Sequence, residues 1–187
     1  MALRAASALP NLNFRLRAGN LNDCVSNFIR GDTAMLLCYE ADTTRPLDFG
    51  PGVARGDWGS DYLVPVVGGA LRYAVTADGR IPATTPAVAY PEDSYFGEAL
   101  TRADRAFGTP SRSAQSSCVT AFSSGTKELV LGGIGVGWLP FSMVHREITS
   151  GDLISLANHL GQVELKVALF ADSKVTPAMD LLTLWSK

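Results

Sequence analysis

Hydrophobic and polar residues follow two different rhythms along the chain. Residues 12–18, LNFRLRA, are apolar at every second position, which predicts a strand. Residues 21–29 space their apolar side chains by three and four, which predicts a helix with Asn20 as N-cap and Gly31 as its stop. A near-continuous apolar run at 33–39 is typical of a strand covered on both faces. Strand, helix and strand in this order predict a βαβ unit.

The alternation of strands and helices continues to the end of the chain. A loop rich in glycine and proline is expected at 40–59. Further strands are predicted at 62–67, 71–76, 87–90, 115–122, 135–139 and 163–170. Further helices are predicted at 95–107 with Ser94 as cap, 126–131 with Ser124 as cap, 141–150, and 177–185 with Thr176 as cap. This order indicates an α/β protein with mostly parallel sheets.

Composition and charge narrow the function classes. The 187 residues are 47% hydrophobic and 18% charged, as in globular domains, and leave room for one substantial domain or two small ones. Sixteen basic against eighteen acidic side chains lack the basic character of a nucleic-acid-binding domain. No apolar run approaches the roughly 20 residues of a membrane span, and no secretory leader is expected. We therefore expect a soluble, cytoplasmic protein with no membrane partner.

Residues that bring catalytic or metal-binding chemistry are few. His145 falls on a predicted helix and His159 in a loop, without metal-ligand spacing, so we predict no catalytic residue, no metal site and no cofactor. Glu92 and Asp93 stand in a turn before a helix, where carboxylates are ordinary capping residues. The glycines at 132–137 follow a predicted helix and precede a strand, the reverse of a dinucleotide-binding loop. We interpret them as a tight turn.

Several segments resemble one known family. Residues 128–140, ELVLGGIGVGWLP, resemble the "lV..G.GvaWLP" segment of the effector-binding domain of LysR-type transcriptional regulators. Residues 151–156, GDLISL, resemble that family's "G.Lv.l" step. Residues 10–20 resemble its "P.v.l.l..G" strand, and residues 62–66, YLVPV, resemble its "d.LvPV" strand. The resemblance covers nearly the whole chain.

The resemblance implies an α/β fold of the periplasmic-binding-protein type 2-like class, with two Rossmann-like subdomains joined by two crossover strands. Residues 1–70 and 163–187 would form regulatory subdomain I, and residues 71–162 regulatory subdomain II. A small-molecule cleft would lie between the subdomains. We find no counterpart of the family's N-terminal winged helix-turn-helix before Leu12, so we expect DNA contact only through a DNA-binding domain absent from this chain.

The expected ligand site follows from strand ends as well as from the resemblance. Ligands of open α/β sheets bind beyond the carboxyl ends of strands, where helix N-termini present backbone amides. The predicted effector-binding residues are Gly19, Asn20, Leu21, Tyr39, Glu40, Tyr90, Pro91, Asp93, Ser94, Ser116, Ser117, Gly135 and Val136, the last two as part of the cleft floor. Helix N-termini at Asn20 and Ser94 favour a carboxylate or another anion. We predict a small anionic or aromatic effector.

These observations predict a ligand-sensing regulatory domain of a LysR-type regulator and not an enzyme. The family implies a homodimer, and a tetramer in the full-length protein, whose geometry relays effector binding to DNA. One alternative is a redox sensor in which Cys118, Met35, Met143 or Met179 is oxidised. Another is a solute-binding protein of the same fold. Cys24 and Cys38 fall on apolar surfaces and are interpreted as small hydrophobic residues.

Overall fold

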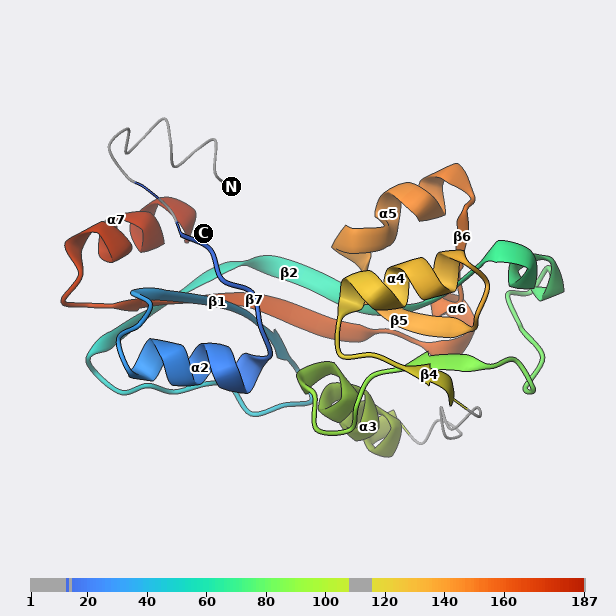
Figure 1. The fold of residues 1–187 in the computed structure, drawn as a ribbon, viewed down its shortest axis with the longest axis horizontal. Helices are drawn as coiled ribbons and strands as arrows, with labels where there is room; N and C mark the ends of the chain where they lie inside the picture. Colours follow the sequence, from blue (N-terminus) through green and yellow to red (C-terminus); the bar gives the residue numbers. More distant parts are fainter. Residues whose placement is uncertain (1–12, 14, 108–115, 187) are drawn as a thin grey trace. The chain divides into compact units, whose positions relative to one another are not determined.

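The structure, a computed structural model, describes residues 13, 15–107 and 116–186, without the side chains of 104–107 and 116–117 (Figure 1). Its helices are α2 (Leu21–Ile29), the 3-10 helix η1 (Gly69–Ala74), α3 (Tyr95–Phe107), α4 (Ser123–Leu131), α5 (Phe141–Ser150), α6 (Ala157–Leu160) and α7 (Thr176–Trp185). Its strands are β1 (Met35–Ala41), β2 (Val53–Gly68), β3 (Ala87–Ala89), β4 (Ser116–Val119), β5 (Val136–Pro140), β6 (Leu153–Ser155) and β7 (Val163–Asp172).

The described strands form one open sheet. Their order is β1-β7-β2-β5-β3-β4, and β6 pairs with β2. β3 runs parallel to both β4 and β5, whereas β2 runs antiparallel to β5 and β6. The predicted α/β class is confirmed, but the sheet is mixed and not mostly parallel, because the long strand β2 runs antiparallel to β5 and β6.

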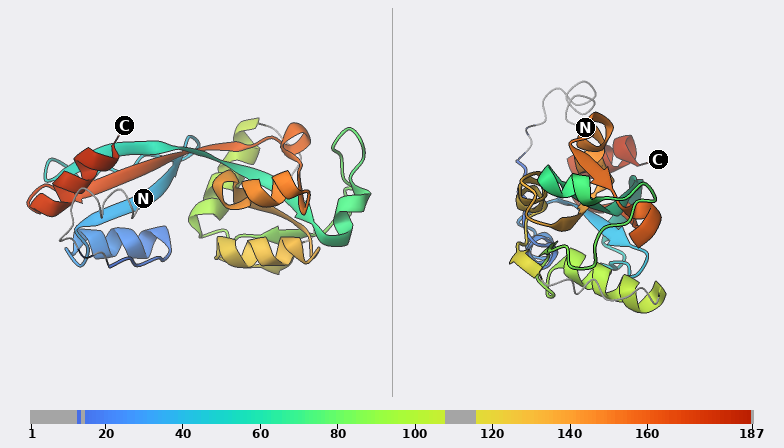
Figure 2. Two further views of the ribbon diagram at one scale, coloured as in Figure 1. Left: turned by 90° about the horizontal axis from the view of Figure 1, so that it is seen from above. Right: turned by 90° about the vertical axis from the view of Figure 1, so that its right-hand side faces the viewer.

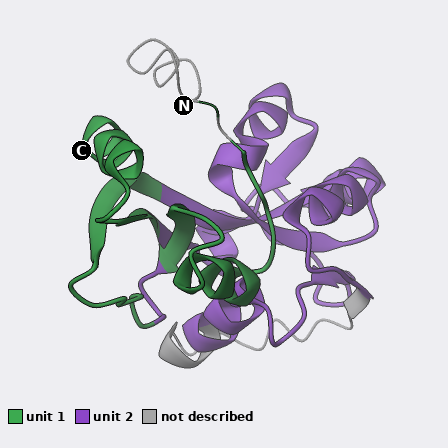
Figure 3. Ribbon diagram, turned by 60° about the vertical axis from the view of Figure 1, so that its left-hand side comes forward, with its two compact units in different colours: residues 1–40, 45–60, 166–187 green, residues 41–44, 61–165 purple. Residues whose placement is uncertain are grey.

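The chain divides into two compact units (Figure 3). Unit 1 comprises Met1–Glu40, Arg45–Ser60 and Lys166–Lys187, and unit 2 comprises Ala41–Thr44 and Asp61–Leu165. The chain passes from one unit to the other within β2 and within β7. The predicted limits of regulatory subdomains at residues 70 and 163 stay a prediction.

Unit 1 has a hydrophobic cluster on each face of β7. Successive side chains of a strand point to opposite faces, so neighbouring residues of β7 enter different clusters. The α2 side holds Phe28, Leu36, Ala168 and Phe170, and the α7 side holds Leu169, Ala171, Ala178 and Leu182. Two helices therefore sandwich the strands of this unit.

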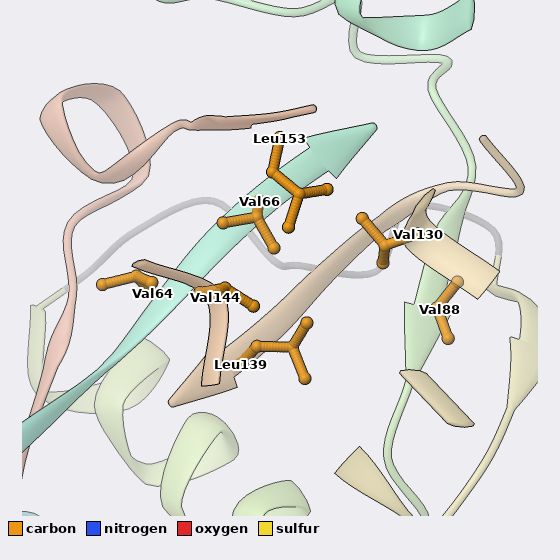
Figure 4. Packing of buried hydrophobic residues seen from close by; sticks show 7 residues of the cluster. All are labelled: Val64, Val66, Val88, Val130, Leu139, Val144 and Leu153. Atoms are coloured by element: carbon orange, nitrogen blue, oxygen red, sulfur yellow. The ribbon is translucent and has the colours of Figure 1, made fainter. Parts of the chain in front are cut away.

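The core of unit 2 lies between its strands and the helices α4 and α5. Its buried members are Val64, Val66, Val88, Val130, Leu139, Val144 and Leu153 (Figure 4). Gly137 of β5 lets α4 pack closely, because a Cβ there would lie 2.6 Å from Val130 Cγ2. Only three residues, 120–122, separate β4 from α4, so the start of α4 lies near the end of β4.

Several predicted helix ends are confirmed in detail. Gly31 has a φ of 77° after α2, and its amide donates to the Phe28 carbonyl while Asp32 donates to the Asn27 carbonyl. This pair of bonds is a Schellman motif, which glycine favours. Gly151 ends α5 in the same left-handed conformation, with a φ of 82°.

Two predicted strands are wrong. Residues 15–18 form no strand with any other described segment, and Leu16 is 82% exposed. Leu12 and Phe14 lie outside the described residues. The predicted strand at 71–76 is occupied by the end of η1, because the chain turns at Gly69, which has a φ of 53°.

Strand β2 begins inside the segment predicted as a loop. Gly56 there serves close packing and not a turn, because a Cβ on it would lie 1.9 Å from Ser186 Oγ. A glycine inside a strand often marks such a close approach. The loop is therefore shorter than the composition of 40–59 suggested.

Candidate functional site

The parallel strands β3 and β4 end side by side in unit 2. Ala89 is paired with Val119, and the Thr120 amide donates to the Ala89 carbonyl at 3.0 Å. Strand β3 leads into α3 and β4 into α4, so both helices begin at this edge of the sheet. We call residues 90–95 and 120–123 the carboxyl edge. This is the position at which open α/β sheets bind ligands.

Helix α3 begins at a side-chain cap. Ser94 Oγ accepts a bond from the Gly97 amide at 3.2 Å and donates to the Pro91 carbonyl at 2.7 Å. The prediction of Ser94 as a cap is confirmed. Gly97 is required there because a Cβ would lie 2.0 Å from the Pro91 oxygen. These contacts fix the backbone between Pro91 and Gly97, on the α3 side of the carboxyl edge.

Helix α4 begins without a side-chain cap. Its N-cap residue is Phe122, whose carbonyl accepts bonds from the amide and the hydroxyl of Thr126 at 2.9 and 3.3 Å. The predicted cap, Ser124, lies inside the first turn, so that prediction is wrong by two residues. Phe122 is 68% exposed, and Val119 is 57% exposed. The α4 side of the edge thus combines backbone amides with apolar surface.

Tyr90 joins the two sides of the edge. Its side chain is buried, and its hydroxyl donates to Ser123 Oγ at 3.0 Å. Burial raises the pKa of the Tyr90 phenol, and its bonds with Ser123 and Thr126 partly oppose that rise. The phenol therefore stays protonated at neutral pH and acts as a donor. It links the end of β3 to the first turn of α4.

Four of the predicted effector-binding residues lie on this edge: Tyr90, Pro91, Asp93 and Ser94. Asp93 is exposed in the turn before α3. The structure adds Thr120, Phe122 and Ser123, which sequence analysis did not select. The apolar pair of residues 121–122 had extended the predicted strand beyond its actual end at Val119.

The predicted pair Ser116 and Ser117 lies at the opposite end of β4. Ser116 begins the strand and is paired with Ala87 at the start of β3. The expectation that this pair follows the carboxyl end of a strand is therefore wrong. The predicted strand at 115–122 already contained both serines near its start, and β4 begins at Ser116.

Gly135 and Val136 also lie away from the carboxyl edge. Val136 begins β5, pairs with Ala87 and donates its amide to the Pro86 carbonyl at 2.9 Å. A Cβ on Gly135 would lie 2.6 Å from that same carbonyl. Ala87 precedes Tyr90 by three residues, about 10 Å along a strand. The structure does not bring these residues together with Tyr90.

The predicted residues of unit 1 fall into two groups. Asn20 is the N-cap of α2, exposed and without a side-chain capping bond, beside exposed Gly19 and half-buried Leu21. Tyr39 and Glu40 lie near the end of β1, where Tyr39 is half-buried. The first group presents a helix N-terminus to solvent.

Glu40 has structural partners for both oxygens. It is buried, its Oε1 accepts from the Leu47 amide at 3.0 Å, and its Oε2 accepts from Arg55 at 2.7 Å. Arg55 stands in β2, within the stretch predicted as a loop, so sequence analysis missed this ion pair. Glu40 fastens the loop after β1 to β2.

The other chemical candidates stay outside the carboxyl edge. The interpretation of 132–137 as a turn between helix and strand is confirmed for residues 132–135, whereas Val136 and Gly137 already belong to β5. Among the described residues, no group of three His, Cys, Asp or Glu side chains could hold a metal ion. Within those same residues, no helix is long and apolar enough to cross a bilayer.

The sequence profile described as the LysR substrate binding domain matches residues 4–185. The chain belongs to the LysR substrate-binding domain family. Such domains are the effector-binding, regulatory parts of transcriptional regulators, as the sequence motifs at 128–140 suggested. No curated protein sequence matches this LysR domain.

Solved structures show the same fold. The apo regulatory domain of HypT from Salmonella typhimurium is 19% identical, with a TM-score of 0.72 over 99% of this chain and 85% of that one. Full-length HypT, titled a hypochlorite-specific LysR-type transcriptional regulator, gives 19% identity and a TM-score of 0.71 over 97% of this chain and 65% of its own.

A third similar structure is full-length LysG from Corynebacterium glutamicum with bound effector Arg. It is 16% identical, with a TM-score of 0.67 over 97% of this chain and 60% of that one. This LysR domain therefore spans about three fifths of that regulator. The fold is the periplasmic-binding-protein type 2-like fold of LysR regulatory domains, as expected.

Proposed function

We propose that this LysR domain senses a small anionic or aromatic effector and contacts it at the carboxyl edge of unit 2. The observation that carries the proposal is the meeting of two helix N-termini at adjacent strand ends, joined by the bond from Tyr90 to Ser123. Backbone amides at such N-termini attract anions.

The two sides of the edge have different chemistry. The start of α4 has no side-chain cap, so its first-turn amides can donate to a carboxylate or another anion. Phe122 and Val119 present apolar surface beside those amides. An aromatic acid would satisfy both features. Asn20 at the N-terminus of α2 is the corresponding proposal for unit 1.

Two similar structures with bound ligands support a small charged effector. The HypT regulatory domain has been solved with a bromide ion bound, and LysG with its effector Arg. Bromide is an anion, and arginine carries a carboxylate. For this chain, the inference rests on the start of α4, which has no side-chain cap, and on membership of the family.

Thermal unfolding against aromatic acids, amino acids, sugar acids and inorganic anions tests the proposal. A ligand at about 100 times its Kd adds about 2.7 kcal/mol to the free energy of unfolding, which raises Tm by several degrees. Phe122→Ala should weaken an aromatic acid about tenfold or more, whereas Tyr73→Ala, at an 84% exposed position outside the edge, should not. Equal affinity of both variants and wild type would refute this placement.

We also propose that the domain works as a homodimer and relays effector binding to DNA through oligomer geometry, with a tetramer in the full-length protein. DarR from Vibrio fischeri, 15% identical, has been solved in complex with DNA, which supports DNA as the final target. Light scattering should give twice the chain mass at micromolar concentration. A chain that stays monomeric at all concentrations up to about 1 mM would contradict the dimer.

A further inference from the structure

Helix α2 and strand β1 run in opposite directions along each other. Five residues, 30–34, join them, and Figures 1 and 2 show α2 lying along β1. Near this connection, Phe28 of α2 and Leu36 of β1 belong to one buried cluster. The helix and the strand therefore pack into the same cluster next to their connection.

This arrangement places Cys24 of α2 and Cys38 of β1 at similar distances from the connection. Four residues back from Phe28, one helical turn or about 6 Å, stands Cys24. Two residues on from Leu36, about 6.6 Å along the strand and on the same face, stands Cys38. Both cysteines are half-buried and pack against the cluster of Phe28 and Leu36. The two thiols therefore lie where helix α2 packs against strand β1.

The electrostatics of the two thiols agree with this arrangement. Burial raises the pKa of the Cys38 thiol to about 12, with Glu40 and, to the smallest extent, Cys24 raising it further and Arg55 opposing the rise. The contribution of Cys24 is consistent with two thiols that pack against one buried cluster.

We propose that Cys24 and Cys38 form a redox pair that closes to a disulfide between α2 and β1 when the domain meets a peroxide. In the first step, the Cys24 thiolate attacks one peroxide oxygen; the O–O bond breaks, Cys24 becomes a sulfenic acid, and water leaves. In the second step, the Cys38 sulfur attacks that sulfenic sulfur, an S–S bond forms, and a second water leaves. Two thiols lose two electrons, and one peroxide gains them.

The order of the steps follows from the surroundings of Cys38. Its thiol is held protonated, so it is a poor first nucleophile at neutral pH. Cys24 reacts first, and Cys38 resolves the sulfenic acid slowly, faster as the pH rises. Both cysteines are free thiols in the reduced protein, so the cross-link is reversible by a dithiol reductant.

Cys118 gives an internal control because it belongs to β4 of unit 2. The reduced full chain is treated with hydrogen peroxide, then alkylated in denaturant, digested and analysed by mass spectrometry. We expect a Cys24–Cys38 cross-linked peptide, a mass lower by about 2 Da, and one alkylated thiol in place of three. Dithiothreitol should restore all three.

Two variants separate the steps. Cys38→Ser should leave a sulfenic acid on Cys24 that dimedone traps, and Cys118→Ser should form the same cross-link as wild type. The proposal is overturned if Cys118 is oxidised at a peroxide dose that leaves both Cys24 and Cys38 alkylatable. It is also overturned if the cross-link found contains Cys118 or joins two chains. The wild-type measurement decides even where a variant fails to fold.

Discussion

Ser142, in the first turn of α5, donates its hydroxyl to Asp61 Oδ2 at 2.6 Å and its backbone amide to Asp61 Oδ1 at 3.1 Å. The N-cap residue of α5 is Pro140, which has no side-chain acceptor, so a carboxylate from β2 caps the helix instead. Asp61 is buried, and its Oδ1 also accepts the Tyr62 amide. One side chain therefore joins strand β2 to the start of α5.

Asp61→Ala should lower the free energy of unfolding by about 2 kcal/mol, because it removes the cap of α5 and takes this acceptor from the amides of Tyr62 and Ser142. Ser142→Ala should cost about 1 kcal/mol. Urea unfolding of both single variants and of the double variant measures the coupling. The double variant should cost clearly less than the sum of the single ones, and simple additivity would show that the Ser142 hydroxyl does not interact with Asp61.

Gly97→Ala should destabilise the domain by about 2 kcal/mol, although alanine favours helices, because the added Cβ meets the rigid Pro91 carbonyl. Gly52→Ala is the matched control, since a Cβ there meets nothing within 4 Å, and its cost should stay within about 0.5 kcal/mol. Thermal or urea unfolding compares the two. Equal stability of both variants would contradict the close approach at α3.

Arg55→Met should cost about 2 kcal/mol, because the Glu40 carboxylate stays buried without its cation. Arg30→Met removes the ion pair with Asp32 at the surface, where both side chains are about half exposed, and should cost less than about 0.5 kcal/mol. Urea unfolding at one pH and salt concentration compares them. A cost for Arg55→Met no larger than that for Arg30→Met would show that Glu40 is stable without a partner.

The stability of the domain should fall as the pH rises above about 9. Burial raises the pKa of Cys38 from its ordinary 9.0 to about 12, so between these values the unfolded chain releases a proton that the folded chain retains. The contribution is complete below pH 9 and is lost toward pH 12. At pH 10 the loss is on the order of 1 kcal/mol. Urea unfolding at pH 8 and 10 should show a smaller decline for Cys38→Ala than for wild type.

The sequence predicted most helices of this domain because their ends carry local signals. Gly31 and Gly151 end α2 and α5 through a positive φ, and Ser94 caps α3 through its own hydroxyl. These features depend only on residues within one turn of the helix end. They can be read from sequence without knowledge of the fold.

The sequence did not predict the role of residues whose contacts come from a distant segment of the chain. In the sequence Gly56 resembles a loop glycine, but in the structure it packs against Ser186 at the end of α7. The role of Arg55 depends on its bond to Glu40, which lies fifteen residues earlier. The candidate site failed in the same way. Ser116 and Ser117 were predicted because they lie near a predicted strand and match the family, but the pairing of β4 with β3 places them at the start of that strand.

Alternate side chains of β7 enter the two clusters of unit 1, so both clusters depend on the register of this one strand. A slip by one residue would turn Phe170 toward α7, where Leu169 now packs, and would turn Leu169 toward α2. Both clusters would be lost at once, because neither space matches the other's side chains. An insertion of one residue within β7 should therefore unfold unit 1, whereas an insertion in the turn at 173–175 would leave both faces intact.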